Sequence, residues 1–174
     1  MELTSAELTI LGLIIERPAH GYDLERVIEQ RGIREWTDVG FSSIYYLLTK
    51  LEKRGLVQGA HAAPGAKSRR VFHATDDGRR VARRDVIAHL VEAHPVPHPF
   101  MVGVANLPLL AEHEYADALR ARLPQIKARI AAVKEAERSQ APLPLAAREV
   151  FSYSLSLLEA ERSWLTTRVQ VSND

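Results

Sequence analysis

The chain has 174 residues, of which 46% are apolar and 26% are charged, a balance that excludes a wholly disordered protein. The absence of cysteine excludes disulfide bonds, thiolate metal sites and a cysteine nucleophile. The 23 positive and 22 negative side chains give a formal net charge of +1, so overall charge does not indicate a nucleic-acid partner. The sequence shows no signal-peptide pattern and no stretch approaching the ~18 consecutive apolar residues of a spanning helix, so we expect a cytoplasmic protein.

Two helices are predicted at the start of the chain. Thr4 and Glu7 have the spacing of a capping box, in which each side chain bonds the backbone N–H of the other residue. Apolar residues at helical spacing follow until Pro18, which ends the first helix. A second helix is predicted from about Gly21, with Gly32 placed to end it.

A third helix and a β-hairpin are predicted next. The helix begins near Ser42, a good N-cap residue, and ends at Gly55. Its apolar residues recur at i, i+3, i+4 and i+7, which predicts one buried face. Residues 56–61 and 70–74 are predicted strands, and the Pro64-Gly65 pair between them predicts a turn.

A fourth helix is predicted from Thr75 or Asp76 to about His94. The order is then three helices, a strand, a basic loop, a strand and a helix, which is the layout of a winged helix-turn-helix. We therefore predict a mainly α protein in which residues 1–94 form a winged helix-turn-helix DNA-binding domain.

The remainder of the chain is predicted to be a linker and a helical domain. Residues 95–108 contain four prolines and predict a semi-rigid extended connector, and residues 109–174 predict an α-helical dimerisation domain. Its two long helices carry apolar stripes that they cover only in part, so we expect a second copy to cover the rest. The expected dimerisation residues are Leu119, Leu123, Ile126, Ile130 and Val133 in the first helix and Val150, Leu157, Trp164 and Leu165 in the last. Pro124 interrupts the first stripe and predicts a kink or a restart of that helix.

Positive charge is concentrated in one block of the chain. Residues 50–84 carry 10 positive and 3 negative side chains, whereas residues 1–49 carry 4 and 8, and residues 85–174 carry 9 and 11. A local basic patch matters more to a polyanionic partner than the net charge does. The patch therefore indicates a polyanionic partner of the predicted winged helix.

The third helix has polar and basic side chains opposite its apolar stripe, and a helix of this size fits the major groove of B-DNA. The expected DNA-binding residues are Ser42, Ser43, Tyr46, Lys50, Lys53 and Arg54 on this helix and Lys67, Arg69 and Arg70 on the wing. Tyr45 is interpreted as a packing residue. Contacts between these cations and phosphates predict strongly salt-dependent binding, and two such helices about 34 Å apart in a two-fold dimer would read an inverted repeat.

Several segments together have a recognisable pattern. They are Leu8-Thr9-Ile10-Leu11-Gly12-Leu13-Ile14, His20-Gly21-Tyr22-Asp23-Leu24, Phe41-Ser42-Ser43-Ile44-Tyr45-Tyr46-Leu47-Leu48, Leu51-Glu52-Lys53-Arg54-Gly55-Leu56-Val57 and Arg70-Val71-Phe72-His73-Ala74-Thr75-Asp76-Asp77-Gly78. This pattern, over roughly residues 3–90, resembles the PadR family of transcriptional regulators, in the branch with a two-helix C-terminal domain. The resemblance implies a homodimeric repressor that binds operator DNA, with an inducer pocket near the dimer interface in some members. The chain departs from the family at Val71-Phe72, where the wing strand usually has two tyrosines, and at Pro124.

Other functions fit the sequence less well. A winged helix that docks a protein without DNA affinity is the alternative, but such modules lack a cationic recognition face. No nucleophile elbow, phosphate-binding glycine loop or His-Glu-x-x-His motif indicates an enzyme. His89, His94 and His98 do not share one helix face, so we expect no metal and no cofactor. The expected partners are double-stranded operator DNA, a second copy of the chain and a small apolar or aromatic effector, and no membrane.

Overall fold

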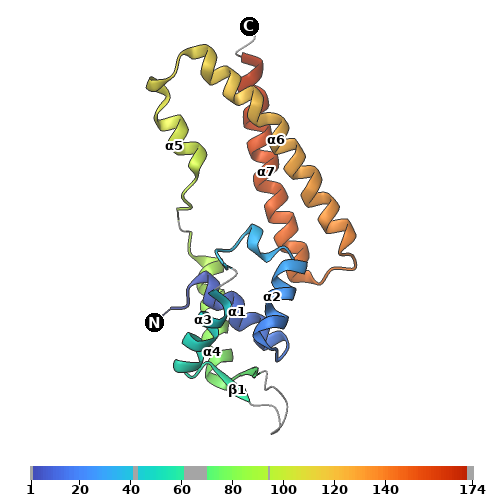
Figure 1. Cartoon of the computed structure of the whole chain (residues 1–174). Helices are drawn as coiled ribbons and strands as arrows, with labels where there is room; N and C mark the ends of the chain where they lie inside the picture. The colour runs from blue at the N-terminus through green and yellow to red at the C-terminus, as the bar shows by residue number, and fades with distance from the viewer. Residues whose placement is uncertain (1, 41–42, 61–69, 94, 172–174) are drawn as a thin grey trace. The chain divides into compact units, whose positions relative to one another are not determined.

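The structure, a computed structural model, describes residues 2–40, 43–60, 70–93 and 95–171. The chain divides into two compact units, Met1–Pro95 and Val96–Asp174, whose α-helices are labelled in Figure 1. No helix of the described ranges is both long enough and apolar enough to cross a membrane.

The first unit has the element order that the sequence predicts. Its elements are α1 (Ser5–Glu16), α2 (Gly21–Gln30), η1 (Ile33–Glu35), α3 (Ser43–Lys53), β1 (Val57–Ala60), β2 (Val71–Ala74) and α4 (Asp76–Val91). The strands β1 and β2 pair antiparallel, with Val57 opposite Ala74. Ala19 extends the sheet through a bridge to Phe72, where the Phe72 N–H donates to the Ala19 carbonyl at 2.9 Å. This arrangement confirms the predicted winged helix-turn-helix and the mainly α fold class.

The predicted helix ends are also present. The Glu7 N–H donates to Thr4 Oγ1 and the Thr4 N–H donates to Glu7 Oε2, so the capping box at the start of α1 is complete. Gly32 follows α2 with a φ of 61° and Gly55 follows α3 with a φ of 70°. Both glycines adopt the left-handed conformation that side chains with a Cβ disfavour. The Gly78 N–H donates to Thr75 Oγ1, so Thr75 is the N-cap of α4.

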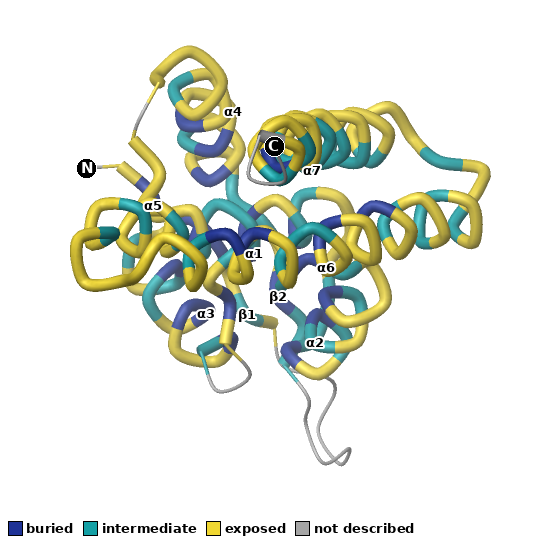
Figure 2. Tube along the Cα trace, turned by 90° about the horizontal axis from the view of Figure 1, so that it is seen from above, coloured by how far each residue is buried: buried dark blue, intermediate teal, exposed yellow. Residues whose placement is uncertain are grey.

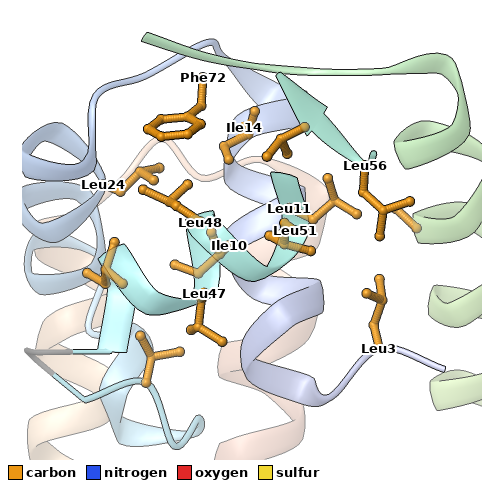
Figure 3. Packing of buried hydrophobic residues seen from close by; sticks show 14 of the residues in the cluster. Leu3, Ile10, Leu11, Ile14, Leu24, Leu47, Leu48, Leu51, Leu56 and Phe72 are labelled. Carbon is orange, nitrogen blue, oxygen red and sulfur yellow. The ribbon is translucent and has the colours of Figure 1, made fainter. Parts of the chain in front are cut away.

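The core of the first unit explains which side of α3 is free (Figure 3). The largest cluster of buried side chains joins α1, α2, α3 and the sheet, and includes Leu3, Ile10, Leu11, Ile14, Leu24, Ile44, Leu47, Leu48, Leu51, Leu56 and Phe72. The four members from α3 have the i, i+3, i+4, i+7 spacing of one helix face. Because this face is buried, the opposite face of α3 is left to the solvent.

The second unit is built on a helical hairpin. Its elements are α5 (Pro99–Ala105), η2 (Leu107–Leu109), α6 (Glu112–Ser139) and α7 (Leu145–Val171), and α6 and α7 run antiparallel. Leu119, Ile126 and Ile130 of α6 and Leu165 of α7 form the buried cluster of this unit. Most other residues of the two helices are exposed, as the yellow parts of the tube in Figure 2 show. The hydrophobic core of the hairpin is therefore thin, with few fully buried side chains along α6.

The prediction of an extended connector over residues 95–108 is wrong from Pro99 onward, where α5 and η2 lie. Pro99 stands in the first turn of α5, where its fixed φ suits a helix and its missing N–H removes no helical bond. Phe100 then anchors α5 on the hairpin. Its ring lies edge-to-face with the Trp164 ring at 5.7 Å and under the Arg122 guanidinium at 4.5 Å.

Of the two expected effects of Pro124, a kink or a restart of the helix, the restart is wrong, because α6 continues through this residue. A proline inside a helix removes one backbone hydrogen bond, which destabilises but does not forbid the helix. Leu119 and Ile126 are buried on either side of Pro124, so their packing holds both turns in one helix.

Candidate nucleic-acid interface

The exposed face of α3 is narrower and more aromatic than the sequence predicts. Tyr45 is 63% exposed and Tyr46 is 67% exposed, and Thr49 and Lys53 are exposed as well. At about 100° per residue these four positions fall within an arc of about 100° on the helix, opposite the buried leucines. We therefore take the exposed face of α3 to be Tyr45, Tyr46, Thr49 and Lys53.

Two of the expected DNA-binding cations lie at the flank of α3 instead. Lys50 Nζ is 2.9 Å from Glu7 Oε1, and Arg54 Nη1 is 3.3 Å from the same oxygen. Glu7 is only 1% exposed, and its other oxygen accepts the Thr4 N–H of the capping box at 2.8 Å. Lys50 and Arg54 thus neutralise a buried carboxylate and fasten α3 to the first turn of α1.

The surroundings of Glu7 stabilise its charged form. Burial raises the pKa of Glu7, but the Thr4 N–H bond and the charges of Lys50 and Arg54 outweigh it, so the pKa lies below its ordinary value of 4.5. Asp85 of α4 is a second buried carboxylate. Burial raises its pKa, but the hydrogen bond from the Leu3 N–H at 2.7 Å and the interactions with Arg84 outweigh it, so the pKa lies below its ordinary value of 3.8.

Arg70, expected on the wing, fastens the sheet to α3. Its guanidinium pairs with Glu52 of α3 and lies 5.2 Å from the centre of the Phe72 ring. The Gly59 N–H donates to the same Glu52 oxygen at 3.0 Å, and a Cβ at Gly59 would collide with the Arg70 side chain. Glu52 therefore connects both strands to α3, and this arrangement fixes the direction in which the hairpin leaves the helix.

Two hydroxyl groups on α3 bond to nearby backbone. Ser43 Oγ donates to the Gly40 carbonyl at 2.7 Å, and Thr49 Oγ1 donates to the Tyr45 carbonyl at 2.9 Å. Among the expected DNA-binding residues, Ser42, Lys67 and Arg69 lie outside the described residues.

The sequence interpretation missed two residues of the exposed face. Tyr45 does pack, because a Cβ on Gly21 would lie 2.6 Å from the edge of its ring, but most of the side chain is exposed. Thr49 was not among the expected residues. The helical period was the available signal, since both residues lie beside Tyr46 and Lys53 on a 100° wheel.

The expected dimerisation residues divide into three groups. Leu119, Ile126, Ile130 and Leu165 are buried inside one chain, where α6 and α7 cover each other, so they have almost no surface left for a second copy. Leu123, Val133 and Val150 are half-buried, whereas Trp164 and Leu157 are exposed, the latter by 56%. The predicted seam is thus the core of the hairpin, which corrects the role of its four buried members.

The first unit also has a shallow apolar groove of about 350 Å³ between α1 and α4. Leu8, Gly12, Ile15, Ala82 and Val86 line it, and the side chains of Arg79 and Arg83 complete its wall. In the parts of the chain that the structure describes, no group of three His, Asp or Glu residues is placed to hold a metal ion.

Comparison with protein families gives one match. The profile of the family described as "Transcriptional regulator PadR-like family" matches residues 10–84, a range that includes most of α1 and all of α3. No curated protein matches the chain.

Solved structures of similar fold extend over nearly the whole chain. Bacillus subtilis PadR in complex with operator DNA has a TM-score of 0.77 at 21% identity, covering 95% of this chain and 98% of that chain. The same protein in complex with p-coumaric acid has a TM-score of 0.77 at 20% identity, covering 97% and 98%. The Vibrio cholerae virulence activator AphA has a TM-score of 0.74 at 20% identity, also covering 97% and 98%. At these identities the similarity shows the fold of both units.

Proposed function

The chain belongs to the PadR-like family of transcriptional regulators, and from this premise we propose that it is a homodimer that binds operator DNA through α3. The exposed face of α3 is the observation that carries the proposal. It presents two tyrosines, a threonine and a lysine on a helix whose opposite face is fixed in the core. A helix supported in this way can enter the major groove without unfolding any part of the unit.

Phosphate contacts would come from the cations that do not serve the core. Lys53 is exposed at the C-terminal end of α3, and Lys67 and Arg69 belong to the wing sequence. Each phosphate that such a cation neutralises releases counterions, so the proposed binding weakens as salt increases.

We propose a two-fold dimer because a single recognition helix contacts only one half-site, and an inverted repeat has two. Exposed apolar residues on α7 support self-association, namely Leu145, Tyr153 and Leu157. We assign the dimer interface to these exposed residues instead of the buried apolar residues of α6, since a second copy can cover only surface that the single chain exposes.

A small-molecule effector that releases the DNA is part of the proposal, with repression as the regulatory outcome in the cytoplasm. The groove between α1 and α4 supports an apolar or aromatic effector, because it is lined mainly by aliphatic side chains. The ligand of Bacillus subtilis PadR in its complex with p-coumaric acid is an aromatic molecule of this kind.

The test is selection of bound fragments from random duplex DNA by the purified protein, followed by titration at several salt concentrations. The proposal predicts enrichment of an inverted repeat and an affinity that falls steeply with salt. Failure to enrich any sequence, with no affinity above that of an unrelated acidic protein, would favour a winged helix that docks a protein partner.

A further inference from the structure

The exposed face of α3 carries only one side chain of the types that usually identify purines, Lys53. Arginine and lysine contact guanine with two hydrogen bonds, and asparagine and glutamine contact adenine in the same way. The sequence of α3, from Ser43 to Lys53, contains no arginine, asparagine or glutamine. Of its two lysines, Lys50 is paired with Glu7, which leaves Lys53 in the last turn.

The polar groups that remain on α3 are largely engaged within the protein. Glu52, which could accept a bond from cytosine, already accepts from Arg70 and from the Gly59 N–H. The hydroxyl of Thr49 donates to its own helix at Tyr45, so toward a partner this side chain presents its methyl group and an oxygen that can only accept a hydrogen bond. The apolar groups at the centre of the exposed face are therefore the aromatic ring of Tyr46 and the methyl group of Thr49.

The major groove offers one apolar group to such a face, the C5 methyl of thymine. We infer that α3 identifies thymine in its half-site, through van der Waals contact of Tyr46 and Thr49 with thymine methyl groups. This inference rests on the proposed function, because it assigns a base preference to the same helix. Lys53 then positions the helix by contact with phosphate and contributes little base preference.

The ring of Tyr45 has a supporting role in this readout. It lies against Gly21 at the start of α2, where a Cβ would be 2.6 Å from the ring edge. Gly21 of α2 thus restrains the ring of Tyr45, while most of its side chain stays exposed on the same face of α3 as Tyr46. Tyr45 thus widens the contact that Tyr46 and Thr49 make.

The experiment removes thymine methyl groups from the DNA without changing any hydrogen bond. Each thymine of a selected half-site is replaced in turn by deoxyuridine, and the affinity of the full-length protein is measured. Because burial of one methyl-sized group is worth about 0.8 kcal/mol, each contacted methyl that is lost should weaken binding by about fourfold.

Protein variants then assign the contacts. Thr49→Ser removes the side-chain methyl and keeps the hydroxyl, and Tyr46→Ala removes the ring. Each variant should abolish the deoxyuridine penalty at one thymine position and leave the other positions sensitive. Lys53→Ala is the control, which should weaken binding to thymine and deoxyuridine duplexes by the same factor. All three side chains are exposed, and thermal melting checks that each variant is folded.

Four results are informative. Penalties at thymines that disappear in Thr49→Ser or Tyr46→Ala would support the inference. A selected operator that deoxyuridine leaves unaffected at every position would overturn it, while the proposed DNA binding would stand. Penalties that persist in both variants would overturn the assignment to these two residues. Absence of any selected duplex would contradict the proposed function itself.

Discussion

Lys50 and Lys53 lie three residues apart on α3, but their charged groups have different surroundings. Lys50 pairs with the buried Glu7 at 2.9 Å, whereas Lys53 belongs to the exposed face. The energetic cost of leaving Glu7 without cations keeps Lys50 at the flank of the helix. Two lysines in one turn of the same helix therefore differ: Lys50 stabilises a buried carboxylate, whereas Lys53 is exposed and is the one that the proposal assigns to DNA binding.

This difference predicts separate effects of two alanine variants. Lys53→Ala should weaken binding to every duplex and reduce the slope of log affinity against log salt by about one, as expected for one lost phosphate contact. Lys50→Ala should change the slope less and lower the free energy of unfolding by about 1 kcal/mol, since Glu7 loses a partner. Anisotropy titrations at four salt concentrations and denaturant unfolding measure the two effects. Equal slopes for both variants would show that the pairing with Glu7 does not withhold Lys50 from DNA.

The buried carboxylates predict how stability depends on pH. The pKa values of Glu7 and Asp85 lie below 4.5 and 3.8 in the folded protein, so the unfolded chain binds protons more tightly. Their contribution to stability is therefore complete above about pH 5 and is lost as the pH falls through the lowered values. Urea unfolding between pH 3 and pH 7 should show this loss. Glu7→Gln and Asp85→Asn should each be less stable at pH 7 and less sensitive to acid, and an unchanged acid dependence in both variants would contradict the assignment.

At the scale of elements, Gly78 tests how closely α4 approaches Leu56, the residue before β1, and Gly12 of α1 serves as the control. A Cβ at Gly78 would collide with the Leu56 carbonyl oxygen, which belongs to the backbone and cannot turn away. Gly78→Ala should therefore lower the free energy of unfolding by about 1–3 kcal/mol. Gly12, inside α1, has no atom within 4 Å of such a Cβ, so Gly12→Ala should raise it by about 0.5–1 kcal/mol through helix propensity. Equal destabilisation by both variants would show that α4 does not approach β1 in this way.

Local signals in the sequence predicted the elements of the first unit well. Thr4 with Glu7, Thr75, Gly32 and Gly55 each act on residues within a few positions, so their caps and helix ends can be read directly. The hairpin of the second unit was predicted for the same reason. The helical spacing of its leucines and isoleucines is itself a local signal for two helices.

Contacts between distant residues were not predictable from these local signals. Arg54 and Glu7 are 47 positions apart, and nothing in the helical period distinguishes a cation that pairs with a buried carboxylate from one that faces DNA. Likewise, the stripe that contains Ile126 could be covered by α7 of the same chain or by a second copy. The burial of Leu165 against it decides for α7. The helix α5 was missed because its prolines were weighed above the apolar residues that follow Pro99.

Buried and exposed apolar residues of the hairpin should respond differently to substitution. Ile126→Ala removes a side chain that is 4% exposed and should lower the free energy of unfolding by about 2–5 kcal/mol. Leu157→Asp changes an exposed side chain and should leave helix content unchanged while it weakens self-association. Circular dichroism and light scattering over a range of concentrations measure both. A Leu157→Asp protein that remains as dimeric as the original would place the interface on another surface.

At the scale of the whole molecule, the proposed dimer determines how the two α3 helices are placed on DNA. Each winged helix supplies one α3 face, and a two-fold axis relates the two faces so that they read the same sequence in opposite directions. Base preference then depends on α3, overall affinity depends on phosphate contacts, and the spacing of the half-sites depends on the dimer. An effector that changes this spacing would release the DNA without contacting either recognition helix.

The most direct test of this account is a titration of the full-length protein with three duplexes of equal length. The first carries the selected inverted repeat, the second has one half-site scrambled, and the third has both scrambled. The account predicts that the first duplex binds much more tightly than the second, and that Tyr46→Ala reduces this preference while Lys53→Ala preserves it at lower affinity. Equal affinity for all three duplexes, or a preference that Tyr46→Ala leaves unchanged, would contradict the claim that a dimer reads DNA through the exposed face of α3.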